Sequence, residues 1–143
     1  MHVSVLGGSF DLDDSLLDAS PEAIREQVRE YERGDRTAFD VAVTFPDTFT
    51  GRVMRAMAEI PPGETRTYGE LAADLDTSAV AVGQACGRNP VPLVVPCHRV
   101  VGTNWLGGFS GETAGDRVDL KRRLLEHESA LPGDRQATLA DEF

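Results

Sequence analysis

Residues 89–101 constrain the fold of this 143-residue chain more than any other segment, because three of its first eight positions are proline. Proline has no backbone N–H, and it disfavours the helical conformation in the residue that precedes it. The stretch therefore predicts extended backbone, and the apolar run at 93–95 predicts a short buried strand. Cys97 and His98 would follow at the end of that strand.

The residues between 48 and 87 predict three helices separated by turn signals. Apolar side chains share one face of the first helix, which starts at Thr48 and is stopped by Pro61-Pro62-Gly63. Thr67 can cap the second, residues 68–75, in an approximate capping box with Glu70, and Ser78 can cap the third, residues 79–86. Two short helices joined by so brief a turn suit a helix-turn-helix, although helical hairpins that bind no DNA are common.

The two ends of the chain predict a small N-terminal unit and a C-terminal helix. Residues 1–47 predict an α/β unit, with strands over 2–9 and 37–45 and a helix over 22–33 after the start signal Ser20-Pro21. This unit holds too few apolar residues to be stable alone. A glycine-rich loop covers 102–111, a helix is predicted over 116–127, and residues 132–143 form a polar tail.

Charge is distributed unevenly along the chain. The formal net charge is −10, whereas a protein that binds nucleic acid is usually basic. Residues 51–109 are nevertheless neutral, with five acids and five bases, so the excess acid lies in the flanking parts. Lysine occurs once, at Lys121, against thirteen arginines, and we interpret this acidic, lysine-poor composition as adaptation to the very salty cytoplasm of a halophile. The alternative is an acidic protein that avoids DNA.

The pair Cys97-His98 carries the candidate chemistry. A cysteine at the end of a buried strand, beside a histidine, can be a nucleophile activated by a base. Adjacent side chains on an extended chain point to opposite faces, so His98 would reach Cys97 through a bent backbone or a water. For an arbitrary pair of this kind, a buried cysteine that only packs is the commoner arrangement. Zinc is disfavoured because Cys86, Cys97 and His98 lack paired ligand spacings.

Two cysteines do not make a disulfide scaffold, and neither a signal peptide nor a membrane-length apolar stretch is recognisable. A cytoplasmic, reduced protein is the expectation.

The residues around Cys97 overturn the packing alternative. The string from Asn89 to Val101 closely resembles the active-site motif of the O6-alkylguanine-DNA alkyltransferases, also called methylated-DNA–protein-cysteine methyltransferases. Residues 60–72 resemble the segment that enters the family's helix-turn-helix, 107–111 its substrate-pocket loop, and 124–128 its closing helix. The resemblance covers about residues 48–129 in the family's order, while residues 1–47 match only loosely.

This resemblance implies an α+β fold in three parts. Residues 1–47 would be a small ribonuclease-H-like α/β domain, and residues 48–131 a winged helix-turn-helix-type domain that binds DNA and accepts the alkyl group. Within the second domain, the helix-turn-helix would cover about 67–87 and the active-site strand and loop 89–101. Residues 132–143 would be a polar tail.

The resemblance also implies DNA repair by a single, irreversible transfer of an alkyl group from O6-alkylguanine, and by extension from O4-alkylthymine. Cys97 would be the nucleophile, and His98, oriented by Glu128, would take its proton through a water. Tyr68 would act as the general acid that protonates the departing guanine. Asn89 would tie the turn between the recognition helix and the active-site strand.

Contacts with the base and with DNA are implied as well. Ser110 would hydrogen-bond to O6, and the carbonyls of Cys97 and Val100 would accept from the exocyclic amine of guanine. The remaining pocket positions are Arg99, Phe109 and Gly111, and the DNA-binding positions are Ala79, Val80, Gln84 and Arg88.

Two positions depart from the family pattern. Val80 stands where relatives usually carry an arginine that fills the gap left by the flipped base, and Glu112 replaces a common glycine.

The expected partner is double-stranded DNA that contains O6-alkylguanine, bound by a monomer without membrane, cofactor or metal. One alternative is a non-enzymatic alkyltransferase-like protein that binds and flags the lesion, but such relatives replace the reactive cysteine. The other is a cysteine hydrolase, which would need an oxyanion hole and repeated turnover.

Overall fold

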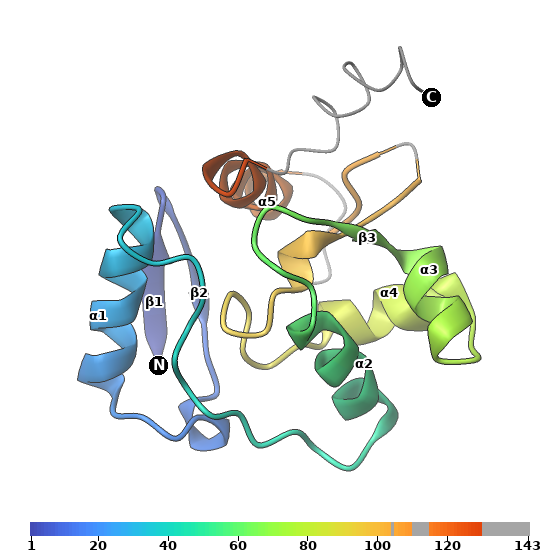
Figure 1. The fold of residues 1–143 in the computed structure, drawn as a ribbon, viewed down its shortest axis with the longest axis horizontal. Helices are drawn as coiled ribbons and strands as arrows, with labels where there is room; N and C mark the ends of the chain where they lie inside the picture. Colours follow the sequence, from blue (N-terminus) through green and yellow to red (C-terminus); the bar gives the residue numbers. More distant parts are fainter. Residues whose placement is uncertain (104, 110–114, 130–143) are drawn as a thin grey trace.

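A β-hairpin starts the protein, shown in Figure 1 as a computed structural model that describes residues 1–103, 105–109 and 115–129. β1 (His2–Val5) and β2 (Gly8–Asp11) pair antiparallel. Leu6 and Gly7 join them with φ angles of 49° and 83°, the positive values that a tight two-residue hairpin turn favours. The prediction of one strand over 2–9 is therefore wrong, because this turn folds the segment back on itself.

One helix packs against the hairpin and confirms the helix predicted there. A 3₁₀ turn, η1 (Asp14–Leu16), comes first, and α1 (Pro21–Glu32) begins after Ser20, whose hydroxyl accepts a backbone hydrogen bond of 3.1 Å. Its buried face consists of Ile24, Val28 and Tyr31.

The strand predicted over 37–45 is wrong. The structure describes all of these residues, and their strand pairing is limited to an isolated bridge between Val43 and Leu17. Alternate apolar side chains do pack against the core, but none of the strands β1–β4 pairs with this backbone.

Three helices follow, and each confirms its prediction. α2 (Phe49–Ala58) begins after Thr48, α3 (Tyr68–Asp74) after Thr67 and α4 (Ala79–Gly87) after Ser78, and each cap hydroxyl accepts a backbone hydrogen bond from the first turn. The capping box of Thr67 and Glu70 is complete in both directions. α4 packs against both α2 and α3, which places the three helices together on one side of the molecule (Figure 1).

The proline-rich segment turns instead of forming the strand predicted at 93–95. Leu93 has a φ of 74°, and the Val95 N–H donates to the Val91 carbonyl at 3.0 Å, so the chain curls before the cysteine. Cys97 then opens a single 3₁₀ turn, η2 (Cys97–Arg99), and β4 (Val100–Val101) follows, paired parallel with β3 (Arg66–Thr67). The strand prediction is wrong because extended backbone cannot continue through a residue with positive φ.

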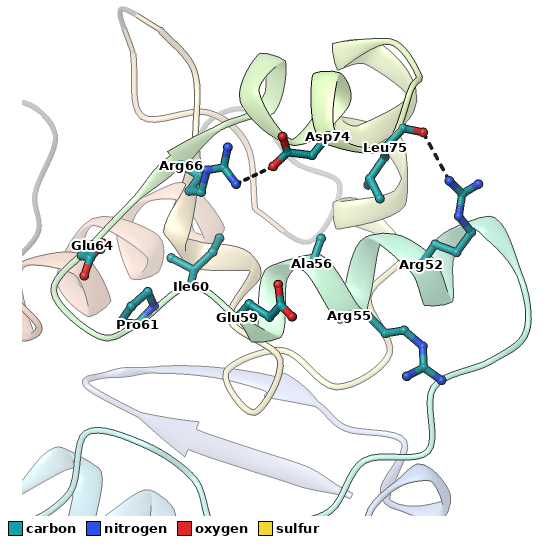
Figure 2. Close-up of a pocket in the computed structure, with 10 residues that line it drawn as sticks. All are labelled: Arg52, Arg55, Ala56, Glu59, Ile60, Pro61, Glu64, Arg66, Asp74 and Leu75. Atoms are coloured by element: carbon teal, nitrogen blue, oxygen red, sulfur yellow. Dashed lines mark hydrogen bonds and ion pairs between the residues drawn. The ribbon is translucent and has the colours of Figure 1, made fainter.

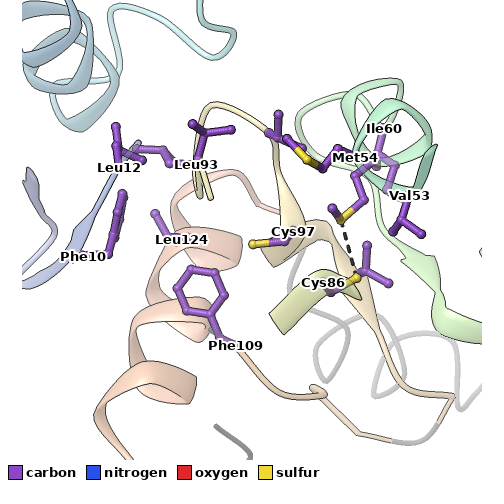
Figure 3. Close-up of a cluster of buried hydrophobic side chains, with 14 of the residues drawn as sticks. Phe10, Leu12, Val53, Met54, Ile60, Cys86, Leu93, Cys97, Phe109 and Leu124 are labelled. Atoms are coloured by element: carbon purple, nitrogen blue, oxygen red, sulfur yellow. Dashed lines mark hydrogen bonds between the residues drawn. The ribbon is translucent and has the colours of Figure 1, made fainter. Parts of the chain in front are cut away.

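One hydrophobic core joins the N-terminal part to the rest of the chain. α5 (Asp116–His127), which confirms its prediction, buries Leu124 in the same cluster as Phe10 and Leu12 of the hairpin region. Figure 3 shows these side chains gathered with Leu93 around Cys97. The protein is thus a mixed structure of helices and small sheets. None of the helices in its described part is long and apolar enough to span a bilayer.

Candidate active site

Cys97 lies at the centre of this core, at the start of η2, and is only 3% exposed. Burial raises the pKa of the Cys97 thiol above its ordinary value. A hydrogen bond from the Asn89 side chain and the positive charge of Lys121 act in the opposite direction without cancelling it. The resting sulfur is therefore a thiol, and a base must remove its proton before it can act as a nucleophile.

Asn89 holds the turn that precedes the cysteine. Its Nδ2 donates to the Val95 carbonyl at 2.9 Å, and its Oδ1 accepts from the Val91 N–H at 3.1 Å, both in the buried interior. These two bonds replace the backbone pairing that a strand would have supplied, so the side chain fixes the curl that aims Cys97 inward.

His98 is fully buried, and its Nε2 lies 2.9 Å from Glu128 Oε2. An ionised carboxylate only accepts hydrogen bonds, so Nε2 carries the hydrogen and the lone pair is on Nδ1. Nδ1 is buried and has no hydrogen-bond partner in the described part of the chain. Burial lowers the pKa of His98, although Glu128 opposes this effect, so the ring is neutral at neutral pH. A neutral imidazole with a free lone pair is a competent general base.

Glu128 is the centre of a buried ion-pair network. Arg99 donates to it twice, from Nε to Oε1 at 2.8 Å and from Nη2 to Oε2 at 3.0 Å, and the Tyr31 hydroxyl donates to Oε2 at 2.7 Å. Burial opposes ionisation of Glu128, but the hydrogen bonds from His98 and Arg99 outweigh it and hold the pKa of this carboxyl below its ordinary value. Glu128 therefore stays charged and keeps His98 in one orientation.

This geometry places Arg99 elsewhere than the pocket position expected from the sequence. Its guanidinium is committed to Glu128 and, through Nη1, to the Ile60 carbonyl at 2.8 Å. With these contacts the guanidinium supports the Glu128 carboxylate, and it has no free pair of N–H groups that could hydrogen-bond to guanine.

Tyr68, the first residue of α3, points its hydroxyl toward the glycine-rich loop. The hydroxyl lies 3.4 Å from the Gly108 carbonyl, and a Cβ built on Gly107 would come within 2.6 Å of it, so a larger residue than glycine cannot approach here. Burial raises the pKa of Tyr68 well above its ordinary value, which keeps the proton on the oxygen.

Lys121 is a functional candidate that no motif in the sequence indicates. It is fully buried, and its Nζ donates to the carbonyls of Val100 at 2.5 Å and Gly108 at 2.8 Å and to the Tyr68 hydroxyl at 3.4 Å. No carboxylate among the described residues forms an ion pair with it, and burial lowers the pKa of this amine to about 8. The one sequence feature that distinguishes it is that the chain has a single lysine and thirteen arginines.

The other predicted pocket residues are only partly described. Phe109 is buried with Cys97 in the same cluster, and the Val100 carbonyl already accepts from Lys121. Ser110, Gly111 and Glu112 lie outside the described residues.

The four predicted DNA-binding residues share the exposed side of α4 and its C-terminal cap. They are Ala79, Val80, Gln84 and Arg88. Val80 is 70% exposed, the largest exposed fraction of any large apolar side chain in the described residues. A Cβ built on Gly83 of the same helix would lie 3.9 Å from the Tyr68 ring. This surface therefore adjoins the residues around Cys97.

A separate groove of about 500 Å³ lies between α2 and α3 (Figure 2). Arg66 and Asp74 pair across its edge at 2.7 Å, and Arg52 donates to the Leu75 carbonyl at 3.3 Å. None of the predicted site residues in the described part of the chain lines this groove, and its acids and arginines are mixed, so it is distinct from the site around Cys97. No group of three or more metal-binding side chains occurs among the residues that the structure describes.

Comparison with known proteins agrees on one family. Residues 48–130 match the family described as 6-O-methylguanine DNA methyltransferase, DNA binding domain. The methylated-DNA–protein-cysteine methyltransferase of Archaeoglobus fulgidus is 38% identical over 115 residues, which cover 79% of this chain and 78% of that protein. The Mycobacterium tuberculosis protein of the same name is 43% identical over 113 residues, 76% of this chain and 66% of that protein.

Solved structures of this kind share the fold. The Mycobacterium tuberculosis OGT in complex with DNA has a TM-score of 0.67 and 41% identity, covering 76% of this chain and 67% of that one. The O6-methylguanine-DNA methyltransferase of Pyrococcus kodakaraensis has a TM-score of 0.60 and 33% identity, covering 78% and 66%.

Proposed function

The chain belongs to the 6-O-methylguanine DNA methyltransferase family, and from this premise we propose that it repairs DNA by moving an alkyl group from guanine O6 onto Cys97. The observation that carries the proposal is a buried thiol followed in sequence by a neutral histidine, whose buried Nδ1 has no hydrogen-bond partner in the described residues. The thioether formed is stable to water, so each molecule acts once and needs no cofactor.

Proton movements in this reaction can be assigned to three side chains. The Cys97 proton goes to His98 Nδ1, through a water, while Glu128 stabilises the imidazolium. The sulfur attacks the alkyl carbon, the carbon–O6 bond breaks, and its electron pair goes to guanine. Tyr68 donates a proton to the guanine ring, which leaves as the neutral base. The positive charge of Lys121 lowers the pKa of Cys97 and thereby favours the thiolate.

The substrate contacts follow from the same proposal. Ser110 would hydrogen-bond to O6, with Gly111 beside it, and the carbonyls of Cys97 and Val100 would accept from the exocyclic amine. Phe109 would supply an apolar wall, in keeping with its burial near the sulfur. O4-alkylthymine presents a similar alkoxy group and is a second candidate substrate.

Binding of duplex DNA is proposed for the exposed side of α4 and its cap, through Ala79, Val80, Gln84 and Arg88. A base inside a duplex must be flipped out to reach a buried cysteine, and the space that it leaves must be filled. Val80 is apolar and 70% exposed, which suits a wedge between base pairs.

The domain roles are proposed accordingly. Residues 48–131 would form a winged helix-turn-helix-type domain and residues 1–47 a ribonuclease-H-like unit, in a cytoplasmic monomer. The tail predicted at 132–143 lies outside the described residues. An acidic composition whose single lysine, Lys121, is buried supports a salt-adapted protein.

Intact mass spectrometry tests the proposal. After incubation with duplex DNA that contains O6-methylguanine, the protein should gain one methylene, mapped to the peptide with Cys97. Cys97→Ser should bind DNA and gain nothing. The matched control is Cys86→Ser, which should transfer normally, because burial raises the pKa of Cys86 to about 12 and no base lies beside it in sequence. DNA binding without any mass gain in the wild type would favour a lesion-binding protein instead.

A further inference from the structure

Glu128 accepts a hydrogen bond from the N-terminal part of the chain, 97 residues away in sequence. The donor is Tyr31 of α1, whose hydroxyl lies 2.7 Å from Oε2, the same oxygen that faces His98 Nε2 at 2.9 Å and Arg99 Nη2 at 3.0 Å. Tyr31 is 1% exposed, so water does not compete for this bond. The oxygen that orients the proposed base is therefore shared with a side chain from α1.

Several contacts hold Tyr31 in this position. Its ring packs against His127 and Phe39, with centroids 4.9 and 5.6 Å away, and its carbonyl accepts from His127 Nε2 at 2.6 Å. Arg123 of α5 also donates to the Leu6 carbonyl of the hairpin at 2.8 Å. His127 thus ties α1 to α5, and Arg123 ties the hairpin to the same helix, which holds the hydroxyl in place.

The hydroxyl changes what Glu128 presents to His98. A carboxylate stabilises a neighbouring imidazolium, and each further donor that shares its negative charge weakens that effect. The groups that face His98 are Glu128, Arg99, Lys121 and the adjacent Cys97, while Glu128 faces His98, Arg99 and Tyr31. Of these donors to Glu128, Tyr31 alone comes from outside the segment 97–129.

We propose that Tyr31 is a positioning residue for alkyl transfer, through which α1 holds Glu128 and keeps His98 in the neutral form that accepts the Cys97 proton. The proposal rests on the proposed function. Residues 1–47 would then contribute to the reaction as well as to the common core. The proposal gives a function to the polar contact between Tyr31 and Glu128, which joins residues 1–47 to the rest of the chain.

Tyr31→Phe tests the proposal, because it removes one oxygen and keeps the ring. Glu128 then becomes a stronger acceptor and stabilises protonated His98, so transfer on saturating DNA should slow at low pH and recover at high pH. In the pH profile of the transfer rate, the acid-side limb should move to higher pH by about half a pH unit or more, as expected for losing one hydrogen bond to a charged group. Phe39→Leu, which loosens the same packing without touching Glu128, should leave that limb in place.

A second measurement uses the protein without DNA. Nitrogen NMR of the histidine rings follows protonation of His98 directly, and this should occur at higher pH in Tyr31→Phe than in the wild type. Wild-type protein that never becomes alkylated would remove the proposed function, yet this titration would still decide the role of Tyr31. Coinciding rate profiles and coinciding titrations for the two proteins, or an equal shift in Phe39→Leu, would overturn the proposal.

Discussion

Replacing Lys121 by methionine separates the effect of its buried charge on stability from its effect on alkyl transfer. The ammonium group is fully buried, without an ion-pair partner among the described residues, and its pKa is lowered from 10.5 to about 8. A shift of that size corresponds to about 3 kcal/mol of unfavourable free energy for the charged form. Methionine has a similar length and no charge, so the Lys121→Met substitution removes this cost.

Hydrogen bonding opposes the gain. Nζ donates to the carbonyls of Val100 and Gly108, and bonds from a charged donor contribute about 1.5–3 kcal/mol each. The two effects offset each other, so the free energies of unfolding of Lys121→Met and wild type should differ by less than about 2 kcal/mol at neutral pH. Transfer should nevertheless slow, because each unit by which the pKa of Cys97 rises lowers the thiolate fraction about tenfold.

The pH dependence of stability distinguishes a buried charged lysine from an ordinary one. Below about pH 8 both folded and unfolded wild type carry the Lys121 proton, whereas between there and pH 10.5 only the unfolded chain does. The unfolded state then binds more protons, so wild-type stability rises with pH relative to the variant, by about 3 kcal/mol in total. Urea unfolding of both proteins at neutral pH and at pH 10.5 measures this difference.

The matched control is Arg122→Met, on the exposed side of the same helix, whose difference from wild type should not change with pH in this way. A constant difference between Lys121→Met and wild type would show that the lysine is not a desolvated cation. Unchanged transfer in that variant would remove Lys121 from the reaction.

Two further substitutions test the proposed pocket and the DNA surface. Tyr68→Phe should slow transfer by roughly 10²–10⁴-fold, the range for loss of a general acid, with little change in DNA affinity; single-turnover rates measure this, and a rate within a factor of two of wild type would exclude Tyr68 as the donor. Val80→Arg should improve transfer from duplex DNA at low salt, with an advantage that shrinks at high salt because screening removes the attraction to phosphates. An equal gain at both salt concentrations would refute the apolar wedge, and so would a Val80→Ala protein that matches wild type in both.

The sequence by itself predicted all the α-helices of the described part of the chain, because their signals are local. A capping side chain such as Ser20, Thr67 or Ser78 bonds to a backbone N–H three residues on, and apolar spacing is set within one or two turns. The family motif around Cys97 also pointed to the family, through residue order alone. Neither signal depends on which distant segments meet.

Strands and buried charges depended on the tertiary structure. A strand needs a partner backbone along its length, and residues 37–45 have the alternating pattern with only an isolated bridge from Val43 to Leu17. Leu93 adopts a positive φ that turns the predicted strand at 93–95. Lys121 and Tyr31 show no local feature that distinguishes a buried donor from a surface side chain. Lys121 reaches the Val100 carbonyl across 21 residues and Tyr31 reaches Glu128 across 97, so only the tertiary packing of α5 and α1 determines these contacts.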